Sequence, residues 1–124
     1  MASNDTSRGG VLVFGLGRFG SAIADTLDNM DVEVLGVERD PAVVERWSKR
    51  IPCVEADGAD PRALEQIGAA DFAAAVVGVG TSLEASVLIT GNLADVGVPE
   101  IWIEVCADAG IAIPATYLRQ SWID

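Results

Sequence analysis

Short apolar runs alternate along the chain with segments in which apolar side chains recur at helical spacing. Continuous apolar runs of this length are typical of buried parallel strands, and we predict strands over residues 10–14, 32–37, 53–55, 73–77 and 101–105. The helical spacing predicts helices over residues 19–30, 42–49, 62–67 and 82–93. This alternation predicts an α/β fold: a Rossmann-type doubly wound parallel sheet, in three layers, with about five recognisable strands and right-handed crossovers.

Four residues mark the expected ends of these helices. Asp40 and Asp60 each stand directly before a proline, and an N-cap followed by proline at the first helical position is a common helix start. Ser82 is a third candidate N-cap, and Gly68 is a candidate helix end.

The two ends of the chain lack a clear pattern. Residues 1–9 are polar and are expected to form a flexible N-terminus, whereas residues 10–105 are expected to form one domain. A helix could begin within residues 107–113, but Gly110 and Pro114 weaken that interpretation. We therefore expect residues 106–124 to be a divergent or truncated tail.

The net charge of −11 and the pI near 4.1 disfavour some classes of binding partner. An acidic chain repels phosphate backbones and anionic headgroups, which disfavours binding to nucleic acid or to a membrane surface. The longest apolar run, residues 72–79, is too short to span a bilayer, and residues 1–6 do not resemble a signal peptide. We expect a soluble, cytoplasmic protein with no direct membrane insertion.

The two cysteines, Cys53 and Cys106, lie in apolar stretches and are interpreted as reduced core residues. A disulfide or a metal site is the alternative. No cluster of ligand residues accompanies either cysteine, so we expect no metal site.

A glycine-rich hexamer stands between the first predicted strand and the first predicted helix: Gly15, Leu16, Gly17, Arg18, Phe19 and Gly20. In a GxGxxG pattern the first glycine makes the tight turn, the second lets a pyrophosphate approach the backbone, and the third lets the helix pack closely on the sheet. Arg18 is either a solvated side chain or a ligand of a terminal phosphate. A glycine-rich turn without a ligand is the alternative interpretation of the hexamer.

An acidic residue, Glu38, follows the second predicted strand, where a carboxylate accepts hydrogen bonds from ribose hydroxyls. Its charge disfavours a 2′-phosphate and therefore NADP, although Arg39 beside it weakens that preference. Loops after the third and fourth strands open onto the same crevice. They contain Asp57, a candidate acceptor for an adenine amino group, and the small residues at 78–81.

Residues 10–20, 33–40, 55–64, 76–86 and 101–103 together resemble the RCK or KTN domain, a TrkA-N-type nucleotide-binding domain of the cytosolic subunits that regulate Ktr and Trk potassium transporters. The resemblance implies an RCK N-lobe with a regulatory, non-catalytic role. Such a lobe binds ATP/ADP or NAD(H) and controls potassium transport through a membrane transporter or channel subunit. The family's domains pair as homodimers and assemble into higher homo-oligomers.

Transferred residue by residue, the resemblance places the phosphates on residues 15–19, with Arg18 reaching a γ-phosphate, and the ribose on Glu38. The adenine side and the far rim fall on Asp57, Gly58, Gly80 and Thr81. Many relatives carry a basic residue near the end of the fifth strand, where this chain has Glu104. Its carboxylate would either oppose a phosphate or hold a divalent cation. The family's second, C-terminal lobe is not recognised in this sequence.

An enzyme is the main alternative, because a fragment of an NAD-dependent oxidoreductase would carry the same glycine pattern. The sequence has no histidine and no cysteine placed near a base, so we predict that the chain is not an enzyme. An interaction module without a ligand is the third class.

Overall fold

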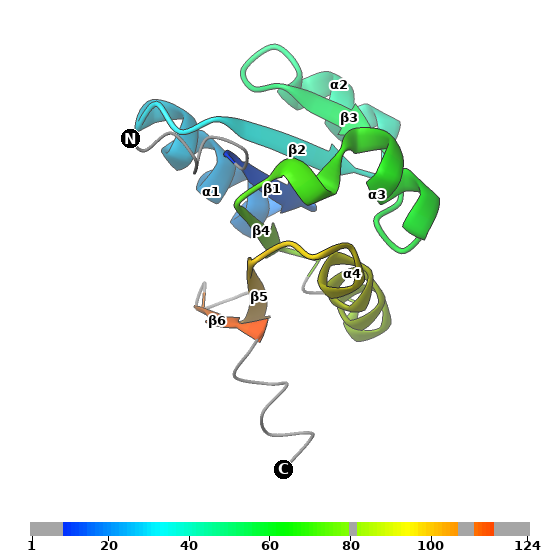
Figure 1. Cartoon of the computed structure of the whole chain (residues 1–124). Helices are drawn as coiled ribbons and strands as arrows, with labels where there is room; N and C mark the ends of the chain where they lie inside the picture. The colour runs from blue at the N-terminus through cyan, green and yellow to red at the C-terminus, as the bar shows by residue number, and fades with distance from the viewer. Residues whose placement is uncertain (1–8, 80–81, 107–110, 116–124) are drawn as a thin grey trace.

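The computed structural model describes residues 9–79, 82–106 and 111–115. Within them, a six-stranded sheet has the order β3-β2-β1-β4-β5-β6. Its strands are β1 (Val11–Phe14), β2 (Val34–Glu38), β3 (Cys53–Glu55), β4 (Ala74–Val77), β5 (Glu100–Cys106) and β6 (Ile111–Pro114). The helices are α1 (Arg18–Asn29), α2 (Pro41–Trp47), α3 (Pro61–Ile67) and α4 (Leu83–Val96), with a short 3₁₀ helix η2 (Ala69–Asp71) after α3 (Figure 1).

The first five strands are parallel, and β1 lies between β2 and β4. Val13 is level with Gly36 on one side and with Val76 on the other. The chain moves outward through β2 and β3 and then returns across β1 to β4 and β5, so the strand order reverses between β1 and β4. Crevices form at such a point because the connections after the two neighbouring strands lead to opposite faces of the sheet. The predicted Rossmann-type doubly wound sheet is confirmed.

The sixth strand is a feature that the sequence analysis missed. β6 pairs with β5 in antiparallel orientation, with Ile103 opposite Ile113 and an irregular register near Glu104. The interpretation of residues 107–113 as the start of a helix is wrong for residues 111–113, which are strand. Only four residues separate Cys106 from Ile111, too few for the crossover that a parallel neighbour needs, so a strand at this distance pairs antiparallel.

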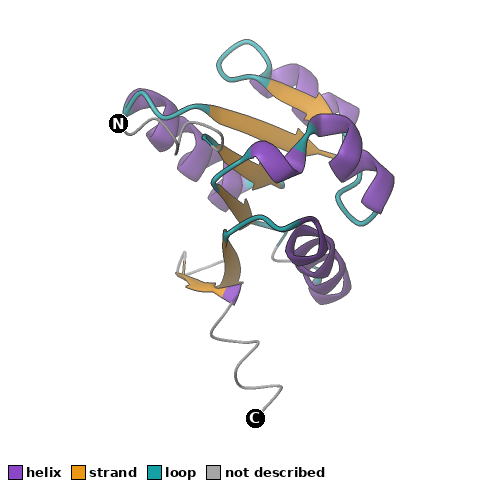
Figure 2. Ribbon diagram, viewed as in Figure 1, coloured by secondary structure: helices purple, strands orange, loops and turns teal. Residues whose placement is uncertain are grey.

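Two separate apolar cores give the predicted three layers (Figure 2). One lies between the sheet and helices α3 and α4, with Phe14, Leu64 and Leu93 at its centre. The other lies on the opposite face against α1 and α2 and contains Val13, Leu16, Ala24, Val34 and Ile51. Both cores bury strand residues next to the crevice, so packed side chains hold the turns at the carboxyl end of the sheet in place.

The helix boundaries follow the predicted caps. The side chain of Asp40 accepts a hydrogen bond from the N–H of Ala42 at 3.0 Å, and that of Asp60 accepts from Arg62 at 3.0 Å. Ser82 Oγ accepts from the N–H of Ala85 at 3.2 Å. Gly68 ends α3 with φ of 74°. These caps are confirmed, whereas α4 continues past the predicted end at residue 93 to Val96.

Candidate functional site

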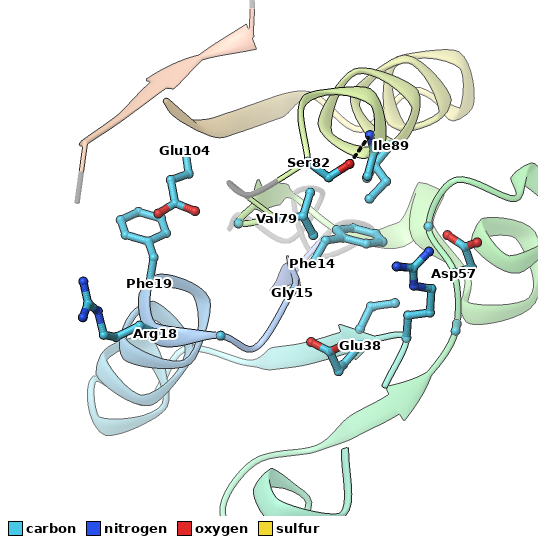
Figure 3. Close-up of a pocket in the computed structure, with 17 residues that line it drawn as sticks. Phe14, Gly15, Arg18, Phe19, Glu38, Asp57, Val79, Ser82, Ile89 and Glu104 are labelled. Carbon is cyan, nitrogen blue, oxygen red and sulfur yellow. Dashed lines mark hydrogen bonds between the residues drawn. The ribbon is translucent and has the colours of Figure 1, made fainter. Parts of the chain in front are cut away.

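A cleft of about 500 Å³ opens at the carboxyl end of the sheet, where strands β1, β2, β4 and β5 and the loop after β3 converge (Figure 3). Eight of the residues predicted for the site line this cleft: Gly15, Gly17, Arg18, Phe19, Glu38, Arg39, Asp57 and Gly58. Leu16 and Gly20 do not line it, and Gly80 and Thr81 lie outside the described residues. Parallel strands present all their carboxyl ends on one edge, and this brings residues far apart in sequence to one place.

Two glycines of the hexamer are required by contacts within the protein. Gly15 has φ of +89°, and a Cβ there would lie 2.6 Å from the carbonyl oxygen of Gly78. A Cβ on Gly20 would overlap the carbonyl oxygen of Gly15. The tight turn and the close approach of helix α1 to it therefore exclude any larger residue at either position.

Gly17 differs from both of them. It is the N-cap of α1, it is exposed, and a Cβ built on it would have no protein atom within 4 Å. No side chain caps this helix. The first backbone N–H groups of a helix have no acceptor within the helix, so this end presents donors toward the cleft.

Glu38 holds the glycine turn in place. One carboxylate oxygen accepts a hydrogen bond from the N–H of Leu16 at 2.7 Å, and the other accepts from the N–H of Asp40 at 2.9 Å. The side chain of Leu16 is 2% exposed and packs in the core beneath α1. Leu16 therefore contributes an anchor and a backbone contact to Glu38, and its side chain does not face the cleft.

Arg18 is the first residue of α1 and is exposed, and its side chain forms no ion pair with the residues that the structure describes. Figure 3 shows Arg18, Phe19 and Glu104 on one side of the cleft and Glu38 and Asp57 on the other. The cleft thus has a cation at the helix start and carboxylates on both sides.

The loop after β3 is built by its own hydrogen bonds. Asp57 Oδ1 accepts from the N–H of Ala59 at 3.0 Å, and the carbonyl of Gly58 accepts from Asn92 Nδ2 at 3.1 Å. A Cβ on Gly58 would lie 2.7 Å from the ring of Phe14. Asp57 is exposed and keeps a second carboxylate oxygen, which the predicted contact with an adenine amino group requires.

Glu104 was not among the predicted binding residues, but it was expected near the phosphates, either to oppose them or to hold a divalent cation, and it lines the cleft. The side chain is buried, and Oε2 has no hydrogen-bond partner among the described residues. The signal in the sequence was an acidic residue near the carboxyl end of the fifth predicted strand, where many relatives carry a basic one. The apolar lining, which includes Phe14, Val79 and Ile89, could not be distinguished from ordinary core residues by sequence.

Within the described residues, no group of three or more His, Cys, Asp or Glu side chains is placed to hold a metal ion. None of the helices in that same part of the chain is long and apolar enough to cross a membrane. Cys53 is a free thiol whose Sγ lies 3.6 Å from the carbonyl oxygens of Val44 and Ile51, and burial raises its pKa above the ordinary value.

Residues 11–121 match the TrkA-N domain family. The chain belongs to this family. The Ktr system potassium uptake protein C of Bacillus subtilis is 33% identical over 97 residues, which is 77% of this chain and 44% of that protein. The chain therefore spans less than half the length of this relative.

Solved structures share the fold at low identity. The NAD(P)-binding domain of an exopolyphosphatase-related protein from Archaeoglobus fulgidus superposes with a TM-score of 0.73 at 18% identity, covering 94% of this chain and 96% of that one. The GsuK channel bound to NAD gives a TM-score of 0.69 at 13% identity, covering 80% of this chain and 18% of that one. The same channel has also been solved bound to ADP. These similarities support the Rossmann-type fold.

Proposed function

We propose that this TrkA-N domain binds an adenine nucleotide, ATP/ADP or NAD(H), in the cleft and acts as a regulatory domain in potassium transport. In this proposal the chain lies on the cytoplasmic side and acts through a membrane transporter or channel subunit, as a homodimer or higher homo-oligomer. The relation to potassium is supported by the Bacillus subtilis uptake protein, and nucleotide binding is supported by the GsuK structures with NAD and ADP.

Gly17 is the observation that carries nucleotide binding. Contacts inside the protein explain why positions 15 and 20 are glycine, but they give no reason for a glycine at position 17. Serine, threonine or aspartate at an N-cap would stabilise α1 by accepting one of its N–H groups. A phosphate that approaches the backbone explains the absence of a side chain there and also supplies the missing acceptor.

The rest of the nucleotide follows from this anchor. With the phosphates at the start of α1, the adenosine extends over β2 toward Glu38 and the loop of Asp57 and Gly58. Each oxygen of Glu38 accepts one backbone N–H and keeps a second lone pair for a ribose hydroxyl. Phe14 and Ile89 supply apolar surface on this side of the cleft.

A regulatory role is favoured over catalysis by the chemistry of the cleft. Its titratable side chains are Arg18, Glu38, Arg39, Asp57 and Glu104, and Glu38 is occupied by two backbone donors. The sequence contains no histidine. A fragment of an NAD-dependent oxidoreductase, the alternative function, is not favoured, because the family and its relative point to transport.

Calorimetric titration of the chain with AMP, ADP, ATP, NAD, NADH and NADP tests the proposal. We expect adenine nucleotides to bind and NADP to bind more weakly than NAD. Gly17→Val should abolish binding while the free energy of unfolding stays within about 1 kcal/mol of that of the unmutated chain, since no protein atom lies within 4 Å of the new Cβ. Nucleotide recovered after incubation should be chemically unchanged.

Gly91→Val is the matched control. Gly91 is also exposed, and a Cβ built on it would contact nothing outside its own helix within 4 Å, but it lies in α4 and does not line the cleft. This variant should bind as the unmutated chain does. Equal binding by Gly17→Val and Gly91→Val would contradict the proposed site.

A further inference from the structure

Glu104 is a buried carboxylate that the fold does not satisfy. Its side chain is 6% exposed, it lines the cleft, and Oε2 has no hydrogen-bond partner among the described residues. A buried charged group without a partner is strongly destabilising, and the proteins that keep one generally use it for binding or chemistry. None of the contacts in the described part of the protein explains why this position is glutamate.

The strand register locates Glu104 relative to the glycine turn. Val77 of β4 is level with Ile103 of β5, so Glu104 lies beside Gly78. Gly78 in turn contacts the turn, because its N–H donates to the carbonyl of Phe14 at 2.7 Å and a Cβ built on it would lie 3.4 Å from Gly20 Cα. The carboxylate of Glu104 therefore lies two strands along the sheet from β1, on the side of the cleft away from Glu38 and Asp57 (Figure 3).

A nucleotide placed as proposed above would extend its far end toward this carboxylate. In that placement the adenosine lies over β2 and the first phosphates lie at the start of α1. The part of the ligand beyond these phosphates then lies over β4 and β5. In ATP that part is an anionic terminal phosphate. In a dinucleotide it is a second ribose, whose hydroxyls are hydrogen-bond donors.

We infer that Glu104 is a specificity-determining residue that selects a dinucleotide such as NAD over ATP by accepting hydrogen bonds from the second ribose. A carboxylate can only accept hydrogen bonds, so it pairs with hydroxyls and repels a phosphate. Arg18 does not neutralise it, since no ion pair joins the two side chains within the described part of the chain. The inference rests on the proposed nucleotide site.

A divalent cation bridging Glu104 to a phosphate is the competing explanation. Magnesium keeps several of its waters and requires near-octahedral geometry. A side chain that is 6% exposed and whose Oε2 is buried leaves little room for a hydrated ion. A single hydroxyl is smaller than a hydrated ion and needs only one lone pair of the carboxylate, so the described geometry favours the ribose.

Titration of the chain with NAD, ADP-ribose, ADP and ATP, each with EDTA and again with excess magnesium, tests the inference. ADP-ribose carries the second ribose without nicotinamide and should bind like NAD. Without magnesium, ATP should bind at least about tenfold more weakly than either. In Glu104→Gln the affinity for ATP should rise about tenfold and that for NAD and ADP-ribose should fall several-fold, while ADP changes little.

Glu100→Gln is the control, because Glu100 is exposed and lies at the opposite end of the same strand. Its replacement changes the net charge by the same amount as Glu104→Gln. It should leave all four affinities unchanged. The ligand ranking of the unmutated chain tests the inference even if Glu104→Gln does not fold. An unchanged ratio of NAD to ATP affinity in Glu104→Gln overturns the inference, as does tight ATP binding that requires both magnesium and Glu104. If the chain binds ADP but shows either result, only the inference fails; if it binds none of the four ligands, the proposed function fails as well.

Discussion

Replacing Glu38 with glutamine should destabilise the domain even when no nucleotide is present. The two carboxylate oxygens accept from the backbone N–H groups of Leu16 and Asp40 at 2.7 and 2.9 Å. A glutamine has one acceptor oxygen, and its NH₂ group would face the other N–H donor. One of the two contacts must therefore be lost, and the remaining one becomes a hydrogen bond between neutral groups.

The expected cost is about 2.5 kcal/mol, because two hydrogen bonds to a charged group are replaced by one between neutral groups. A hydrogen bond to a charged group contributes about 1.5–3 kcal/mol and a neutral one about 0.5–1.5 kcal/mol, and the half-buried position of Glu38 places both near the lower ends of these ranges. For a domain of this length, that loss corresponds to a Tm lower by roughly 10 °C. Urea unfolding of the nucleotide-free chain measures it, and the m-value should not change because the same surface is exposed on unfolding.

Glu55→Gln provides the control for this measurement. Glu55 is the register partner of Glu38 on β3, it is exposed, and its side chain accepts no hydrogen bond from the described residues. Its replacement should change the free energy of unfolding by less than about 0.5 kcal/mol. If Glu38→Gln is as stable as Glu55→Gln, Glu38 does not anchor the glycine turn and the reasoning is refuted.

Two further variants test the packing of the fold. Gly20→Ala should lower the free energy of unfolding by at least about 3 kcal/mol, because its Cβ would overlap the carbonyl oxygen of Gly15. The control Gly91→Ala should be neutral or stabilising. A Gly20→Ala chain of normal stability would contradict the close approach of α1 to the turn. Burial raises the pKa of the Cys53 thiol, so the folded chain binds this proton more tightly than the unfolded chain. The stability that this proton provides is complete below the ordinary thiol pKa and is lost as the pH rises through the raised pKa. The free energy of unfolding should therefore fall less steeply between pH 7 and 10 in Cys53→Val than in the unmutated chain. If the two plots of unfolding free energy against pH are parallel, the thiol is not desolvated.

The sequence by itself determined the alternation of strands and helices and most of the helix boundaries. Asp40, Asp60 and Ser82 cap their helices through N–H groups two or three residues away, and Gly68 ends α3 through its own backbone angle. These are local interactions, so they can be recognised from adjacent residues. The parallel orientation of the first five strands could also be predicted, because a helix separates each of these strands from the next.

The tertiary structure alone separated the roles of the three glycines in the hexamer. A glycine pattern has the same letters whether each glycine avoids a clash inside the protein or leaves space for a ligand. Only the positions of Gly78 and of helix α1 show that Gly15 and Gly20 are required for packing and that Gly17 is not. The predicted nucleotide contacts of these residues stay predictions.

The tertiary structure also decided the surroundings of the two carboxylates. Glu38 was predicted as a ribose acceptor, and the fold adds its contacts to the N–H groups of Leu16 and Asp40. Glu104 lies 66 positions further along the sequence, and the pairing of β4 with β5 brings it to the same cleft. β6 was missed for a related reason, since its pairing with β5 is a contact between strands and leaves little trace in a short local pattern. Such contacts depend on the order of strands in the sheet, which is set by packing between distant residues.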